Sequence, residues 1–427
     1  MNHTLPRLAA IALLAAAAAP AQALSLRAAA TAALHHDPRF DQADAEIDAA
    51  RAGESVARAN DAFTLGLAAD LGRSDLQTDA PFPQSGLRTP NSLAVAASQP
   101  LYTGGRSAAL ESAAQRAVEA ALERRRDVGG KIILATLTAY LDLKRDRETL
   151  RLAQASRNTL QQARSDVDKR YAAGEATRTD LAQADARLAE AAAQVERSEA
   201  QRRASEISLE RLIGPLPADL DAPWPGLLAT AGSRDEAVRQ SHSAPGVLAA
   251  KHGQRAAGAQ IEAAEAERMP KLSLDARAAT QDNSDFGYER LSTWALQLKL
   301  QVPIVTGGLV RARVGEARAR AASAGHLASD TEALYAETAA REWELLRASG
   351  PVIAAFNAQV QAADLALDGV RKELKVGSRT TLDLLDAERD LLSAQVNLVA
   401  AQRDRAVTAF RLLAACGKLE LENVPDQ

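Results

Sequence analysis

Residues 294–308 read WALQLKLQVPIVTGG, and residues 92–105 read SLAVAASQPLYTGG. In the first stretch, apolar residues alternate with residues that are mostly polar, and this period of two predicts a strand with one apolar face. The second stretch alternates in the same way. Both end in Thr-Gly-Gly and continue directly into a long helical pattern. This shared order of strand, glycine pair and helix indicates that one unit occurs twice.

The repeated unit is about 200 residues long. When the chain is shifted against itself, turn residues of the first half fall on identical residues of the second: Pro100 on Pro303, Gly104 and Gly105 on Gly307 and Gly308, Gly174 on Gly377, Asp180 on Asp383, and Gly214 on Gly417. Upstream of the strands the shift is slightly larger, and Pro38 falls on Pro245. The first copy therefore has the longer loop between its strands. A unit of this length indicates a duplicated half-protein, because solenoid repeats are only about 20–50 residues long.

Both copies have the same predicted order of elements, and the predicted fold class is mainly α with a small β part. Each copy begins with an alanine-rich helical segment (26–60 and 233–268) and continues through a strand hairpin (63–102 and 271–305). It ends with a helix of about 70 residues, a glycine turn and a helix of about 35. The predicted divisions are a signal peptide at 1–23, a first repeat at 24–214, a linker at 215–232, a second repeat at 233–417 and a short C-terminal tail at 418–427.

The first residues have the pattern of a secretory signal peptide. A positive charge near the start is followed by an apolar core at 11–19 and a small-x-small cleavage site at 21–23. We therefore expect the mature chain to begin at Leu24, outside the cytoplasm. The single cysteine, Cys416, lies far from this site, so we expect neither an intrachain disulfide nor the lipid-bearing first residue of a lipoprotein.

The predicted strands are long enough to cross a membrane. Each alternating run has about 10 residues, which suffices for a tilted strand. Their loops at 74–89 and 281–289 are polar and rich in turn residues. One chain supplies four strands, whereas a barrel in lipid needs at least about eight to close, so one chain cannot form a barrel, and three chains would supply a workable even number of twelve. Helices of about 70 residues would reach about 105 Å, more than twice the thickness of a bilayer, so most of the chain should stand in water.

Composition and motifs argue against several other classes of protein. The formal net charge is −4, which gives no basic footprint for nucleic acid. We find no nucleophile and base pattern for catalysis and expect no cofactor. His35, His36 and Asp37 are not expected to bind a metal, because adjacent histidines on a helix point apart. The glycine pairs 104–105 and 307–308 lack the lysine of a phosphate loop, and we interpret them as bends from strand to helix.

Four features occur together: the signal peptide, the duplicated helix–hairpin–helix unit, the Thr-Gly-Gly junctions and the run VGSRTTLDLLDA at 376–387. In this combination the chain resembles the TolC family of outer-membrane factors over nearly its whole length. The resemblance implies a homotrimer in the outer membrane of a Gram-negative bacterium, with a twelve-stranded barrel in the lipid and a long helical barrel in the periplasm. It also implies passive export within a tripartite efflux pump or type I secretion system, with a periplasmic adaptor and an inner-membrane transporter at the tip.

Two aspartates near the glycine turns have a structural explanation. Thr177 with Asp180, and Thr380 with Asp383, fit the capping-box pattern at the start of a helix. The resemblance gives the turns themselves a further role in docking the partners. These turns are Gly174 and Gly377.

Two other charged residues lack this explanation, because the first copy has alanine and glutamine in the places of Arg379 and Asp386. The resemblance implies that these positions belong to a closed periplasmic aperture. Arg379 would bridge to Asp180, and Asp383 and Asp386 would line the constriction. Such a ring of carboxylates would favour cations.

One departure from the family pattern is Gly350-Pro351 in the second long helix, where a proline removes a backbone hydrogen bond and usually bends the helix. The alternative to a channel is a soluble periplasmic coiled-coil adaptor or scaffold, which alanine-rich helices alone would permit. Two hairpins of bilayer length argue against it. The candidate interfacial aromatic residues are Tyr102, Phe286, Tyr288 and Trp294.

Overall fold

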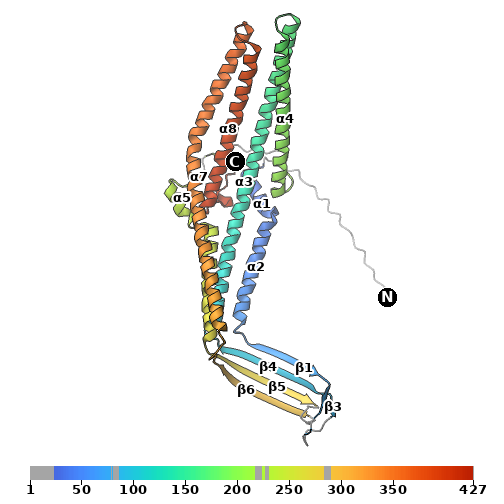
Figure 1. The fold of residues 1–427 in the computed structure, drawn as a ribbon, viewed down its shortest axis with the longest axis vertical. Coiled ribbons are helices and arrows are strands. Elements are labelled where there is room, and N and C mark those ends of the chain that lie inside the picture. Colours follow the sequence, from blue (N-terminus) through green and yellow to red (C-terminus); the bar gives the residue numbers. More distant parts are fainter. Residues whose placement is uncertain are drawn as a thin grey trace, which may run out of the picture.

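The computed structural model describes residues 24–77, 79, 86–216, 224–226, 230–282 and 290–426. The predicted signal peptide lies outside these residues, as do Phe286, Tyr288 and parts of the predicted loops and linker. The molecule is a long rod with a four-stranded sheet at one end and the tips of two helical hairpins at the other (Figure 1).

Two helices of equal length run through most of the rod. They are α3 (Arg106–Ala172) and α7 (Leu309–Lys375), each of 67 residues, which corresponds to about 100 Å at 1.5 Å per residue. Each turns back into a shorter helix, α4 (Arg178–Ile213) or α8 (Thr381–Ala415). Pro351 lies inside α7, which nevertheless remains one uninterrupted helix.

The helical segment that opens each copy is divided, although the sequence pattern predicted a single run. The first consists of α1 (Leu26–His36) and α2 (Pro38–Ala59). The second consists of α5 (Arg234–Ser241), α6 (Pro245–Glu265) and the 3-10 turn η1 (Ala266–Arg268). One break directly precedes Pro38 and the other precedes Pro245, because proline has no amide hydrogen to continue a helix and restricts the residue before it.

The two hairpins form one antiparallel sheet with the order β1-β4-β5-β6. Its strands are β1 (Thr64–Leu71), β4 (Asn91–Tyr102), β5 (Lys271–Asp282) and β6 (Arg290–Gln301). The β4–β5 pairing joins the two copies, while β1 and β6 are the edges. The longer loop of the first copy, predicted to be irregular, contains an additional ribbon of β2 (Ser74–Leu76) and β3 (Gly86–Arg88).

The register of the sheet separates an apolar face from a polar face. Leu67 pairs with Val95, Val95 with Ala278, and Ala278 with Trp294, which places these residues in one row. Trp294 is 85% exposed and Leu67 70% exposed, so the apolar face is uncovered. The predicted alternation is therefore confirmed. The leucines on this face are Leu65, Leu67, Leu71, Leu93, Leu272, Leu274, Leu296, Leu298 and Leu300.

Among the described helices, none combines the length and the apolar character that crossing a membrane requires.

The main hydrophobic core lies at the middle of the rod, where both ends of the described chain meet α3. Leu26 of α1, Leu137 of α3 and Phe410 of α8 are completely buried there. The Arg27 side chain donates a hydrogen bond to the backbone oxygen of Val424 at 3.0 Å. This bond fastens the segment after α8, including the 3-10 turn η2 (Leu421–Asn423), to α1.

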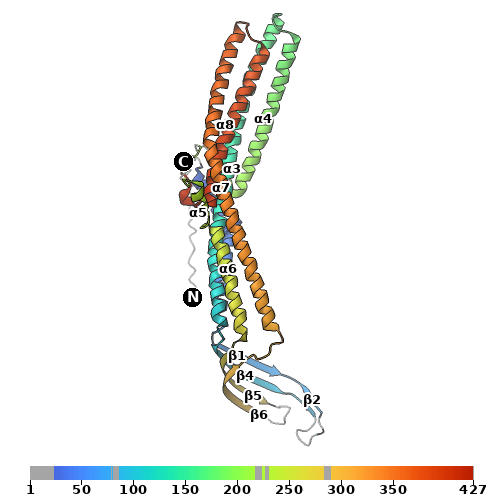
Figure 2. The same cartoon turned by 60° about the vertical axis from the view of Figure 1, so that its left-hand side comes forward.

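Shorter helices meet end to end beside α3 and α7. Both α6 and α8 pack against α3 and α7, and they approach each other from opposite ends of the rod (Figure 2). A Cβ atom at Gly417, just after α8, would lie 2.8 Å from the Cα of Ala244 and 2.9 Å from the Cδ of Pro245. In the first copy, Gly214 at the end of α4 faces the ring of His36 beside the start of α2. The half toward the tips is a layer of α3, α4, α7 and α8, and the half toward the sheet is a layer of α2, α3, α6 and α7.

We predict that Gly417→Ala destabilises the protein more than Gly377→Ala does. Both glycines have left-handed backbone angles, with φ of 69° and 77°, but a Cβ at Gly377 would meet nothing within 4 Å. The conformational cost alone is about 1–2 kcal/mol, and the clash at Gly417 should add about 1–3 kcal/mol. Denaturant unfolding in detergent would measure both variants. Equal losses of stability would contradict the close end-to-end packing of α8 and α6.

Candidate functional site at the helical tips

Each long helix ends in a glycine turn of the same geometry. The backbone N–H of Glu175 donates to the Arg170 oxygen at 2.8 Å, and that of Ser378 donates to the Glu373 oxygen at 3.0 Å. These bonds close a loop around a glycine with positive φ, namely 78° at Gly174 and 77° at Gly377. This is the hydrogen-bond pattern with which glycine commonly terminates a helix. The tips of the two copies are therefore equivalent in backbone structure.

A capping box begins the helix after each turn. The backbone N–H of Asp180 donates to Thr177 Oγ1 at 3.2 Å, and the N–H of Thr177 donates to Asp180 Oδ2 at 2.8 Å. Thr380 and Asp383 repeat these bonds at 3.2 and 2.9 Å. In both boxes the backbone N–H of the threonine lowers the pKa of the aspartate, because it stabilises the ionised carboxylate. Asp180 and Asp383 thus hold equivalent structural positions.

Arg379 pairs within its own hairpin. Its Nε lies 2.9 Å from an oxygen of Glu373, at the end of α7, and its Nη1 lies 4.0 Å from Asp383. Among the ion pairs of the described residues, none joins Arg379 to Asp180. Within one chain, Arg379 therefore neutralises charge at the second tip.

Asp386 takes part in an ion pair that joins the second repeat of the chain to the first. Its Oδ1 lies 3.0 Å from Nη2 of Arg187, on α4. Arg187 also pairs with Glu190 at 3.0 Å, one turn along the same helix. Sequence reasoning did not select Arg187, although a signal was present: the second copy has Asp390, of opposite charge, at the equivalent position.

An apolar cluster joins the hairpins beside this ion pair. Leu367 of α7 is 1% exposed and Leu385 of α8 is 2% exposed, and both pack with Leu160 and Ala163 of α3. Leu188 of α4, next to Arg187 in the chain, packs against the cluster. The Arg187–Asp386 pair therefore lies at the boundary between a packed joint and the exposed tips.

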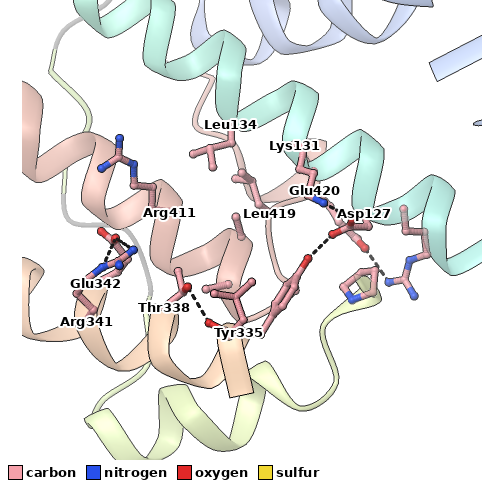
Figure 3. A pocket seen from close by; sticks show the side chains of 17 residues that line it. Asp127, Lys131, Leu134, Tyr335, Thr338, Arg341, Glu342, Arg411, Leu419 and Glu420 are labelled. Atoms are coloured by element: carbon pink, nitrogen blue, oxygen red, sulfur yellow. Dashed lines mark hydrogen bonds and ion pairs between the residues drawn. The ribbon is translucent and has the colours of Figure 1, made fainter. Parts of the chain in front are cut away.

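A cavity of about 430 Å³ lies at the middle of the rod, between α3, α7 and α8 (Figure 3). The hydroxyl of Tyr335, on α7, donates to Asp127 Oδ1 on α3 at 2.5 Å, and Lys131 pairs with the same aspartate at 2.6 Å. Burial and this carboxylate raise the pKa of Tyr335, so the phenol stays neutral. Glu342 is buried beside Arg341, with 3.2 Å between the charged groups. The Tyr335–Asp127 hydrogen bond fastens α7 to α3, while the ion pairs of Lys131 and Glu342 lie within α3 and within α7.

Asp37 and the junction glycines, which were considered for metal and phosphate binding, have structural roles in the fold. Asp37 caps α2, accepting a hydrogen bond from the backbone N–H of Arg39 at 3.0 Å. Within the described ranges, no group of three or more potential metal ligands occurs. The junction glycines all have positive φ, and a Cβ at Gly104 would lie 2.4 Å from the Cβ of Met269. The junction glycines are Gly104, Gly105, Gly307 and Gly308.

Residues 29–215 and 239–418 match the family of outer membrane efflux proteins, described by that name. The chain belongs to this family. As an outer membrane efflux protein it is a channel with a periplasmic extension, and it is not an enzyme. The two matched segments cover most of both copies.

Several relatives of this efflux protein match over most of their length. It is 29% identical to the outer membrane efflux protein BepC of Brucella suis over 390 residues, which cover 89% of this chain and 84% of BepC. It is 30% identical to protein CyaE of Bordetella pertussis over 403 residues, covering 91% of this chain and 82% of CyaE. The crystal structure of VceC from Vibrio cholerae superposes with a TM-score of 0.82 at 24% identity, covering 92% of this chain and 96% of VceC. The TolC-like fold is therefore shown.

We predict that the two capping boxes stabilise this efflux protein only above the pKa of their aspartates. The folded pKa of Asp180 and Asp383 lies below the unfolded value of about 3.9. Their contribution is therefore complete above about pH 5 and is lost as the pH falls through the folded pKa. The double variant Asp180→Asn with Asp383→Asn should melt earlier than the parent at pH 7, and the difference should be smaller near pH 2. A difference of equal size at both pH values would contradict the assignment.

Proposed function

We propose that three copies of this efflux protein form one export duct, with a twelve-stranded barrel in the outer membrane and a helical barrel in the periplasm. The observation that carries the proposal is the sheet, whose edge strands β1 and β6 each have one hydrogen-bonded neighbour. Its leucine-rich face is uncovered, as a face in contact with lipid would be. An open edge in lipid leaves backbone groups without partners, at a cost of several kcal/mol each. Pairing β1 of one chain with β6 of the next chain would leave no strand edge without a partner.

The layer of helices supports the same assembly. The described α5 and the segment after α8 lie at the middle of the rod, beside the long helices and not across them (Figure 2). A ring of three such layers encloses an unobstructed channel when these segments lie outside. The soluble adaptor or scaffold alternative leaves the uncovered leucines unexplained, and the family match argues against it.

The two glycine turns are the proposed docking points for the periplasmic adaptor and the inner-membrane transporter of a tripartite efflux pump or a type I secretion system. Both turns are exposed, and Val376, beside Gly377, is 79% exposed. An apolar side chain at the end of a rod is suited to contact with another protein.

Export would be passive, and we expect the mature chain to start at Leu24 without a lipid anchor.

The proposed gate lies at the second tip. Asp383 and Asp386 are three residues apart at the start of α8, a spacing that places them on one side of a helix. Three copies would bring six carboxylates to one opening, where they would favour cations. The proposed bridge from Arg379 to Asp180 would form between neighbouring chains of the trimer. Within each chain, the Arg187–Asp386 pair would hold α8 against α4 and neutralise Asp386, one of the two acids.

The oligomeric state provides the first test. Because four strands cannot close, we predict a trimer in detergent, measured as the mass of the protein without bound detergent. We also predict that only the trimer conducts ions in planar bilayers. A conducting monomer would contradict the proposed architecture.

The gate provides the second test. We predict that Arg187→Gln raises single-channel conductance and cation preference, because it releases α8 from α4 and leaves Asp386 only its longer contact with Arg389, at 3.8 Å. The effect per ion pair is small, about 0.2–1 kcal/mol for an exposed pair, but it is repeated three times in the ring.

Arg164→Gln is the matched control for this test. Arg164 pairs with Asp185 at 2.8 Å, also between two helices, but α3 and α4 belong to the same hairpin. Its loss should leave conductance unchanged. If both variants conduct like the parent while remaining trimeric, the Arg187–Asp386 pair is not part of the gate.

A further inference from the structure

The polar face of the sheet carries an arginine in a row of small residues. Arg277 of β5 pairs with Ala96 of β4 on one side and with Ala295 of β6 on the other. Ala96 in turn pairs with Gly66 of β1. At this level of the sheet, three of the four strands therefore contribute only a hydrogen or a methyl group. The arginine side chain is exposed above a cavity of about 490 Å³ that these residues line.

The aspartates on the same face accept hydrogen bonds from serines. Asp275 accepts hydrogen bonds from Ser98 at 2.6 Å and from Ser273 at 3.0 Å. Asp70 accepts one from Ser92 at 3.0 Å. Among the described residues, no ion pair involves Arg277. Its guanidinium donors are therefore available to a ligand.

The duplication makes this charge specific to the second copy. By the shift that aligns Pro38 with Pro245, the position equivalent to Arg277 in the first copy is Asp70. One scaffold position thus carries opposite charges in the two copies. Asp70 pairs with Ser92 in the register, whereas Arg277 pairs with Ala96, so the two charges lie at different levels of the sheet.

The geometry of a closed barrel determines where this charge acts. Twelve strands about 4.8 Å apart and tilted by about 40° enclose a cylinder of roughly 12 Å radius. The apolar face must contact lipid, so the polar face lines the lumen. An extended arginine side chain reaches about half of that radius toward the axis, and the remaining gap is shorter than the Debye length of about 10 Å at 0.1 M salt. The electrostatic potential of the guanidinium group therefore extends across the lumen and acts on ions that pass through it.

We propose that Arg277 forms a ring of three guanidinium groups inside the barrel, a site that attracts anions and binds multivalent oxyanions such as phosphate or carboxylate groups of cargo. This inference rests on the trimeric barrel proposed above. Guanidinium groups suit such ligands, because their donors match the oxygens of phosphates and carboxylates in pairs. The duct then has two charge filters in series, acidic at the periplasmic tip and basic in the membrane.

The test is ion selectivity in planar bilayers, measured as the reversal potential across a KCl gradient. Because the tip filter is in series, the measurement uses the background Asp383→Asn with Asp386→Asn. In this background we expect Arg277→Gln to lower the ratio of anion to cation permeability about threefold, the order expected for three nearby charges under partial screening. Arg277→Lys should keep most of the preference.

Arg290→Gln is the matched control, because Arg290 pairs with Asp282 at 2.7 Å on the opposite face of the sheet. It should leave selectivity unchanged. The parent itself provides a further measurement: inorganic phosphate added on the side of the strand loops should reduce its current, and less so in Arg277→Gln.

The outcomes separate the two proposals. Conducting trimers in which Arg277→Gln matches the parent in selectivity, or in which phosphate has no effect on the parent, would overturn the arginine ring and leave the export duct intact. A parent that forms no conducting trimer would overturn the duct, and the ring with it.

Discussion

The architecture depends on the contact between shorter helices that together cover the two long helices. Only α3 and α7, among the described helices, reach from the sheet to the tips, and each needs neighbours along its whole length to bury its apolar residues. The chain meets this need with shorter helices that meet at the middle of the rod, where α8 abuts α6 and α4 abuts the end of α1, just before α2. The abutment leaves no room for a Cβ at Gly417. Both halves of the layer, and hence the positions of sheet and tips, follow from this joint.

On this duplicated scaffold, backbone geometry is shared and charge is not. Turns, capping boxes and hairpins recur in both copies with nearly the same distances. The charges differ at residues that we propose to act in transport, namely Arg187, Arg379 and Asp386 at the tips and Arg277 in the sheet. A trimer of identical chains would turn each difference into a ring. In the proposed duct, one copy would thus keep an uncharged or oppositely charged residue where the other supplies charge for permeation.

Much of this organisation was predictable because it is local. Alternation in 294–308, the glycine turns and the capping boxes depend on residues within a few positions of each other. Two predictions were wrong in detail, since a proline divided each opening helical segment and the longer loop contained a ribbon. The Arg187–Asp386 pair was missed, because it joins residues 199 positions apart and only the packing of α4 against α8 brings them together.

The sequence by itself determined the duplication, the strands and helices, the apolar face of each strand, and thereby the family. Periodicity carries this information, since burial on one side of an element imposes a pattern on neighbouring residues. Tertiary structure alone decided which hairpins pair, that Arg379 contacts Glu373 within its own tip, and that Arg277 stands in a row of small residues. These features depend on register and on packing between distant segments. A shift of two residues in register would keep Arg277 on the same face but give it neighbours other than Ala96 and Ala295, a difference that no local pattern around the arginine records.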